Sequence, residues 1–142
     1  MSHDGEGPTR IVGPLTVRAS SADLAAFDAA TNFHVEAGHK GTRATVPLSY
    51  LPTLLGHPSV KPLVMEALRE LGGHAHASHV HVKQEVTIHH PLEPDRPYSL
   101  ILNCRRHGAK FIQIAGEISD PGAGPVAQMQ SEFLVAQAGD IA

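Results

Sequence analysis

The feature that most constrains the fold is a change of period at Gly72-Gly73. Before these glycines, apolar residues recur with helical spacing, at Val60, Leu63, Val64, Ala67, Leu68 and Leu71. This spacing predicts a helix with one continuous apolar stripe, capped at its start by Ser59 and ended by the glycines. From Val80 onward apolar and polar residues alternate instead, as in a strand that is buried on one face. The helix is therefore expected to pack its stripe against a sheet.

Three more alternating segments follow the first strand, separated by the turn-rich stretches PLEPDRP, RHGA and DPGAGP. We predict a four-stranded antiparallel meander, with a fifth strand near residues 11–17 at an edge and a flexible tail over residues 1–10. The residues expected on the apolar side of the first strand are Val80, Val82, Val86 and Ile88. Those of the last strand are Ala127, Met129, Ser131, Phe133 and Val135.

The segment between the N-terminal strand and the long helix is predicted to be mostly irregular. Ser20 and Asp23 have the spacing of a capping box, which places a short helix over residues 22–31. Residues 32–45 contain two glycines and no steady period, and loops of that length are often functional. Three prolines between Val46 and Pro58 allow only a broken or single-turn helix. The expected fold class is α+β.

Size and charge narrow the classes of function. A chain of 142 residues with 42% hydrophobic residues suits one domain, 1–142. A formal charge of −3 with scattered Lys and Arg argues against nucleic-acid or membrane partners. The polar N-terminus and the lack of a long apolar run predict a cytoplasmic protein. The single cysteine, Cys104, is interpreted as a small apolar filler. Open sheet edges and a thin core predict a dimer.

Six of the eleven histidines lie between Gly72 and Leu92. Alternation places His79, His81 and His89 on the polar face of the first strand, whereas His74 and His76 have the opposite parity. All six cannot surround one ion, and no third donor is placed by sequence beside a His-x-His pair. We therefore predict no metal site, and interpret the histidines as the polar side of a strand or of a subunit interface. At an interface they could make association depend on pH.

The chain resembles the hot-dog fold and, within it, the MaoC-like hydratases and dehydratases. The segments that carry the likeness are ADLAAFDAATN, TVPLSYLPTLL, VHVKQEVTIHHPLEPDRPYSL and AKFIQIAGEISDPGAGPVAQMQSEFLVA. In that family the strand after the central helix ends in a basic or histidine residue, then Pro-Leu, then an acidic turn, as His90-Pro91-Leu92 and Pro94-Asp95 do here. The resemblance implies a long central helix wrapped by an antiparallel sheet, and no cofactor.

The resemblance also implies a chemistry. Similar proteins hydrate trans-2-enoyl groups, or dehydrate 3-hydroxyacyl groups, carried as thioesters on coenzyme A or acyl carrier protein in fatty acid metabolism. The family places an Asp-x-Asn-Pro-x-His motif in the loop before the central helix. The corresponding stretch here, ATNFHVEA, keeps Asn32 and His34 but lacks the Asp five residues before the His and lacks the Pro. His34 is then the candidate base, with Asn32 or Glu36 to orient it or its water; a loop histidine without a catalytic role is the alternative.

The thioester carbonyl is expected to be polarised by backbone N–H groups where Gly56, His57 and Ser59 lead into the long helix. For His57 itself, capping the helix or lining its start is favoured over catalysis. Arg105, Arg106 and Lys110 flank one hairpin turn and could meet the phosphates of the thioester carrier, or be an ordinary charged hairpin tip.

Two other functions stay open at the level of the sequence. The first is a non-catalytic hot-dog subunit that binds the acyl chain beside an active partner, which would make the dimer a heterodimer rather than a homodimer. The second is a thioesterase. Hot-dog thioesterases often carry a carboxylate on or near the central helix, and Glu66 has that position. Glu66 lies off the apolar stripe, so an exposed helix residue is the favoured interpretation.

Overall fold

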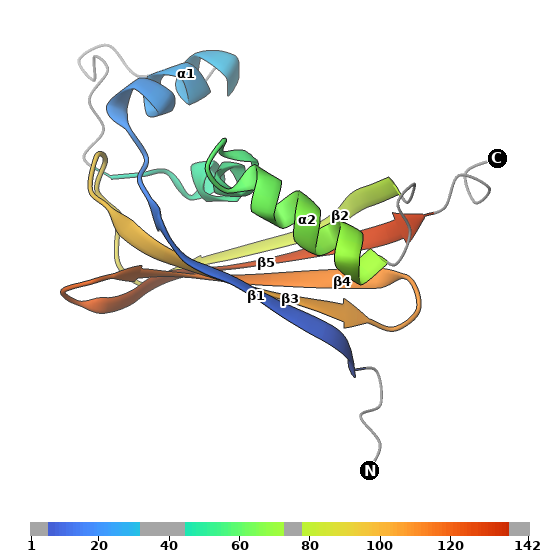
Figure 1. Ribbon diagram of the computed structural model, residues 1–142. Coiled ribbons are helices and arrows are strands. Elements are labelled where there is room, and N and C mark those ends of the chain that lie inside the picture. The colour runs from blue at the N-terminus through green and yellow to red at the C-terminus, as the bar shows by residue number, and fades with distance from the viewer. Residues whose placement is uncertain (1–5, 32–44, 73–77, 137–142) are drawn as a thin grey trace.

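A computed structural model describes residues 6–31, 45–72 and 78–136. In chain order the elements are β1 (Glu6–Val17), α1 (Ser21–Thr31), the 3-10 helix η1 (Leu48–Gly56), α2 (Lys61–Gly72), β2 (Ser78–Ile88), β3 (Tyr98–His107), β4 (Phe111–Asp120) and β5 (Gly124–Ala136). Helix α2 lies across one face of the sheet, and α1 and η1 lie at the end of the sheet where α2 begins (Figure 1). The predicted α+β class is confirmed.

The five strands form one antiparallel sheet in the order β1-β3-β4-β5-β2. The meander of β3, β4 and β5 and the edge position of β1 were predicted correctly. The prediction that the strand after α2 continues this meander beside β3 was wrong, since β2 pairs with β5. A tight β2–β3 hairpin is excluded by the three prolines of residues 89–97. The N–H groups of His89 and His90 donate instead to the carbonyl oxygen of Val126, near the start of β5.

Strand β1 begins earlier than the sequence indicated. It starts at Glu6, and Thr9 and Arg10 pair with Arg105 and Cys104 of β3. Residues 6–10, which were assigned to a flexible tail, are therefore part of the sheet. The alternation was hard to see because two register shifts interrupt the pairing of β1 with β3, and each shift changes which side chains face the core.

A bulge in β2 overturns the predicted burial of its first half. His81 pairs with Phe133 and Lys83 pairs with Glu132, so the pairing shifts at Val82. Val80 and Val82 are consequently 45% and 49% exposed, whereas both were predicted to face the core. The His81 ring, predicted on the polar face, stacks on Phe133 with ring centroids 4.7 Å apart. After the bulge the predicted parity holds, because Val86 and Ile88 pack against the core.

The core lies between α2 and the sheet. All members of the predicted helical stripe except the half-buried Leu63 are buried, and α2 packs on β1, β3 and β4. The facing residues of β3 and β4 are fully buried: Leu100, Leu102, Cys104, Ile112, Ile114 and Ile118. Cys104 thus fills space as expected, and burial raises the pKa of its thiol to about 11. On β5, Ala127, Met129, Ser131 and Val135 are buried and Phe133 is half-buried, as the alternation predicted.

Candidate functional site

The amino end of α2 is built around His57. Its backbone is extended (φ −63°, ψ 140°), and its carbonyl oxygen accepts hydrogen bonds from the N–H groups of Val60 at 2.8 Å and Lys61 at 2.7 Å. Its Nδ1 accepts the Ser59 N–H at 3.2 Å and lies 2.8 Å from the Ser59 hydroxyl. This is the geometry of an N-cap, with Pro58 in the first position of the turn. The cap that sequence assigned to Ser59 therefore belongs to His57.

This cap already uses backbone N–H groups that would be needed to bind an oxyanion. The His57 N–H donates to the carbonyl oxygen of Leu54 at 3.1 Å, and the Ser59 N–H donates to the His57 ring. Because Nδ1 accepts from Ser59, the ring proton of neutral His57 sits on Nε2. The part given to His57 and Ser59 in binding a carbonyl oxygen stays a prediction, and it requires a bound substrate to compete with these bonds. Gly56, also predicted there, is exposed at the end of η1.

Helix α1 is positioned by a hydroxyl cap and by an aromatic contact with η1. The Ser20 hydroxyl accepts the Asp23 N–H at 3.0 Å, which confirms the predicted capping residue. The Phe27 ring meets the Tyr50 ring edge-on, with centroids 5.3 Å apart. Burial, together with the charge of Asp23, raises the pKa of Tyr50. Thr31 ends α1, so the candidate residues Asn32, His34 and Glu36 follow it directly in the chain but lie outside the described residues.

The three basic residues predicted to bind the carrier's phosphates do not act as one group. Arg106 donates to the carbonyl oxygen of Leu71 at 2.6 Å and to that of Ala109, and so joins the last turn of α2 to the hairpin. Arg105 points to the other face of the sheet, where it donates to Gln113 Oε1 at 2.6 Å. Lys110 is exposed, and its backbone carbonyl oxygen accepts a hydrogen bond from the Val135 N–H at 2.7 Å. Because α2 is about 18 Å long, Arg106 is far from His57.

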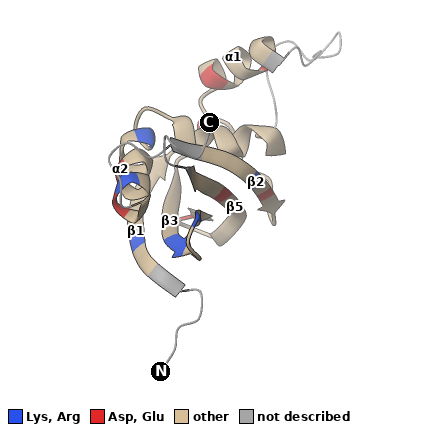
Figure 2. Cartoon of the chain, turned by 90° about the vertical axis from the view of Figure 1, so that its right-hand side faces the viewer, with Lys and Arg blue, Asp and Glu red and all other residues tan. Residues whose placement is uncertain are grey.

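Glu66, the candidate thioesterase carboxylate, is engaged with β1. Arg10 bridges Glu66, at 3.5 Å, and Glu70 one turn further along α2. The basic band of β1 lies beside the acidic bands of α2 (Figure 2). The Glu66 side chain is 48% exposed, so the exposed position that was favoured is correct, with the addition of an ion pair. A carboxylate neutralised by Arg10 on the side of the helix is poorly placed to activate water against a thioester.

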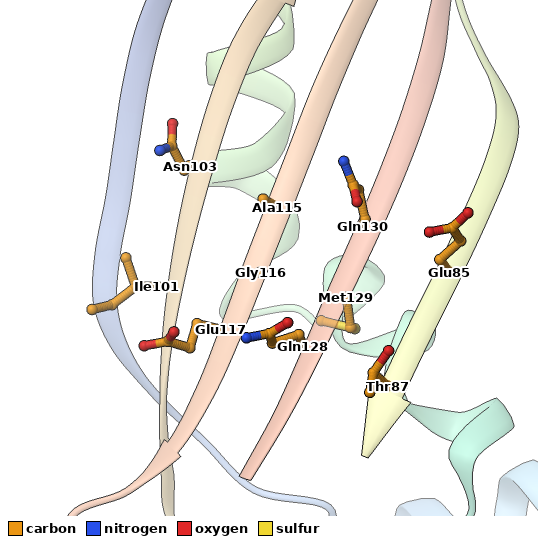
Figure 3. Close-up of a pocket in the computed structure, with 10 residues that line it drawn as sticks. All are labelled: Glu85, Thr87, Ile101, Asn103, Ala115, Gly116, Glu117, Gln128, Met129 and Gln130. Atoms are coloured by element: carbon orange, nitrogen blue, oxygen red, sulfur yellow. The ribbon is translucent and has the colours of Figure 1, made fainter. Parts of the chain in front are cut away.

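A hollow of about 450 Å³ lies on the opposite face of the sheet from α2. Its outward-facing side chains stand in two cross-strand rows (Figure 3). Glu117 and Gln128 lie in one row, and Ala115, Gln130 and Glu85 lie in the other. Ala115 is a small side chain among longer neighbours in its row (Figure 3). None of the lining residues is a lysine or arginine, and none was predicted as a site residue. The only signal in the sequence is that the lining residues with outward-facing side chains, such as Glu85, Glu117 and Gln128, take the polar positions of their strands.

The described residues contain neither a cluster of metal ligands nor a membrane-spanning helix. Within residues 6–31, 45–72 and 78–136, no group of three His, Cys, Asp or Glu side chains is placed to hold a metal ion. His74 and His76 of the histidine-rich stretch fall outside those ranges. None of the described helices has the length and apolar character needed to cross a membrane.

Comparisons with known proteins identify the fold. No family model matches the sequence, and no curated protein matches it significantly. Among solved structures, a hot-dog-like protein from Thermanaerovibrio acidaminovorans superposes with a TM-score of 0.62 at 17% identity, over 94% of this chain and 84% of that one. An (R)-hydratase from A. caviae, involved in PHA biosynthesis, gives 0.59 at 14% identity, over 91% and 95%.

The neighbours differ in activity. The HadBC complex, a 3R-hydroxyacyl-ACP dehydratase from Mycobacterium tuberculosis, gives a TM-score of 0.57 at 14% identity, over 94% of this chain and 100% of that one. Thioesterases are also among the similar structures. Identities this low define the architecture and leave the reaction to be argued from the site. With its central helix laid on a five-stranded antiparallel sheet, the chain has the hot-dog fold.

Proposed function

We propose that this chain is a MaoC-like acyl-thioester hydratase or dehydratase, acting on trans-2-enoyl or 3-hydroxyacyl groups carried by coenzyme A or acyl carrier protein. The observation that supports the proposal is that η1 leads into the start of α2 at the end of the sheet where α1 lies (Figure 1). The contact between Phe27 and Tyr50 joins α1 to η1, and η1 leads through Gly56 into α2. The candidate catalytic stretch follows α1 directly in the chain, and the proposal requires it to reach the helix start that would bind the carbonyl oxygen.

In the proposed hydration, His34 removes a proton from water as the water oxygen bonds to C3 of the enoyl group. The electron pair of the C2–C3 double bond moves toward the thioester carbonyl, whose oxygen gains negative charge. Backbone N–H groups at the start of α2 stabilise that charge, aided by the helix dipole. C2 then takes the proton from the His34 imidazolium, which restores the neutral base, and Asn32 or Glu36 orients the imidazole or the water. Dehydration follows the same steps in reverse.

A second candidate is a non-catalytic acyl-binding subunit of a heteromeric dehydratase. The observation that favours it is the His57 cap, because the Ser59 N–H already has an acceptor at 3.2 Å. The altered motif around His34 agrees with it. The neighbouring HadBC complex is a dehydratase solved as a complex. A thioesterase is a weaker candidate, since Arg10 engages Glu66.

We also propose a homodimer formed through β2. This strand is a free edge of the sheet, and its exposed Val80 and Val82 leave apolar surface there. Adding a β2 strand from a second copy would pair the open N–H and C=O groups and cover both valines. Val82→Arg should convert the dimer to a monomer in sedimentation velocity, whereas Ile101→Arg, at another exposed apolar residue on β3, should not. The same oligomeric state in the two variants, or a monomeric parent protein, would contradict a dimer formed through β2.

The catalytic proposal is tested by following the loss of enoyl absorbance with short and medium trans-2-enoyl-CoA, beside a thiol-release assay. The enzyme should hydrate without releasing thiol, and His34→Ala should abolish hydration. His39→Ala is a matched control because it removes another histidine of the same loop sequence. Thiol release would identify a thioesterase. Absence of both activities would favour the binding subunit, whose partner would then be sought by reconstituting dehydratase activity with related hot-dog chains.

A further inference from the structure

The connection between β2 and β3, residues 89–97, touches both ends of the segment that contains α1. At the entry, the Asp95 N–H donates to the carbonyl oxygen of Ala19 at 2.8 Å, and Asp95 Oδ1 accepts the Ser21 N–H at 2.8 Å. The Ser21 hydroxyl donates to the other carboxylate oxygen. At the exit, the Val46 N–H donates to the carbonyl oxygen of Leu92 at 2.8 Å. One short connection thus holds the two points between which residues 22–45 run.

This connection is itself anchored to the sheet. Leu92 is 3% exposed, and Tyr98, at the first position of β3, is 4% exposed. The Tyr98 hydroxyl accepts the Glu93 N–H at 2.7 Å. Arg96 donates to Glu93 at 2.6 Å and to Asp120, at the end of β4, at 2.7 Å. The connection is therefore a fixed support from which Asp95 and Leu92 reach the α1 segment.

Asp95 is suited to its place in two ways. Its φ is +65°, a left-handed conformation that Asp and Asn adopt more readily than other side chains. Its carboxylate lies at the amino end of α1, where a negative charge is favourable, and bonds from the Ser21 hydroxyl and N–H lower the pKa of Asp95, with a smaller contribution from Arg18. Ser20 caps a different N–H, that of Asp23, so the two caps at this helix end are not redundant.

We propose that Asp95 is a positioning residue: it fixes the entry of the α1 segment onto the β2–β3 connection, which also holds the segment's exit through Leu92. The sequence between these anchors includes Asn32, His34 and Glu36. On the proposed function, on which this step rests, Asp95 sets where the catalytic base stands without touching the substrate. The buried Leu24 and the contact between Phe27 and Tyr50 also help to hold α1.

The test compares Asp95→Gly, Asp95→Asn and, as a matched control, Glu93→Gln in the full chain. Glycine keeps the positive φ and removes the carboxylate, whereas asparagine keeps the φ and one oxygen for the Ser21 N–H. Glu93 belongs to the same connection but contacts Arg96 rather than α1. Amide hydrogen exchange reports local opening of α1, and hydration kinetics report the position of the base.

We expect Asp95→Gly to speed exchange of the α1 amides about five- to tenfold, with β3, β4 and β5 unchanged. It should lower kcat by roughly tenfold while KM changes less than about twofold. Asp95→Asn should keep the exchange rate of the α1 amides and kcat close to those of the parent protein, and Glu93→Gln should match the parent in both quantities. Unchanged α1 exchange in Asp95→Gly overturns the proposal. Faster exchange with unaltered kcat overturns the positioning role. If the parent protein shows no hydration, the proposed function fails and the anchoring role is decided by exchange alone.

Discussion

Replacement of His57 separates a capping role from a catalytic one. Alanine removes the acceptor of the Ser59 N–H, seen at 3.2 Å, and the partner of the Ser59 hydroxyl at 2.8 Å. Loss of an N-cap costs about 1 kcal/mol, and a domain of this size loses roughly 2–4 °C of melting temperature per kcal/mol. His57→Ala should therefore lower Tm by about 3 °C and the urea midpoint correspondingly. Asparagine is a strong N-cap residue whose side-chain oxygen can take the same N–H, so His57→Asn should melt close to the parent.

The same pair of variants bears on chemistry. If His57 only caps the helix, His57→Asn keeps both stability and hydration, and His57→Ala loses stability with a modest drop in rate. A parent-like Tm in His57→Ala would refute the cap, because the Ser59 N–H would then be no worse off facing water. Full stability but no hydration in His57→Asn would show instead that the imidazole ring itself takes part in the reaction.

Three further predictions concern the rest of the chain. A methyl group on Gly13 would meet a backbone carbonyl oxygen at 2.6 Å, at a φ of +105°, whereas one on Gly108 meets nothing within 4 Å. Gly13→Ala should therefore lower the free energy of unfolding by about 3 kcal/mol, and Gly108→Ala by about 1 kcal/mol. Equal losses of the two variants in urea titrations would contradict the close contact at Gly13. Cys104, buried and with a pKa near 11, should react with a thiol reagent at pH 8 only as fast as the protein unfolds. The hydrogen bond from the Gly122 N–H and the Arg96 guanidinium hold the pKa of Asp120 below its ordinary value. The ionised Asp120 therefore stabilises the fold above the ordinary pKa of an aspartate, and this contribution is lost as the pH falls through the lowered pKa. Asp120→Asn should make the free energy of unfolding depend less on pH in this acid range.

Much of the fold follows from the sequence because burial is periodic. The stripe from Val60 to Leu71 and the alternation in β3, β4 and β5 report directly which side chains leave water. The errors occur where backbone geometry breaks the period. At Val82 a bulge moves the side chains to the other face, and in β1 two shifts hide the strand's first residues. The shift at Val82 has no local sequence signal, whereas the two shifts in β1 span Gly7-Pro8 and Gly13-Pro14, which could have indicated them.

The prediction of the strand order was wrong for a different reason. Alternation predicts that a segment is a strand, but the partner depends on the connections, and the sequence of residues 89–97 shows only that no tight hairpin is possible there. The candidate site was predictable to a similar degree. The location of a helix start at Gly56 to Ser59 was correct in outline, yet the assignment of the cap to His57 depends on a ring orientation that spacing does not encode. The contacts of Asp95 join residues 74 positions apart, and no periodicity reports such a distance.

The role of Asp95 also bears on the likeness to MaoC-like proteins. The stretch His90-Pro91-Leu92 with Pro94-Asp95 was a main carrier of that likeness. In this structure its residues bind the backbone of Val126, Val46 and Ala19 and the first residue of α1. A support of this kind serves a catalytic chain and a binding subunit equally, because both must hold the α1 segment in place. The motif is therefore evidence for architecture and is neutral on activity. The distinction between the two candidate functions falls on residues 32–36, so loss of hydration in His34→Ala, with Asp95→Asn still active, is the pattern that would establish an enzyme.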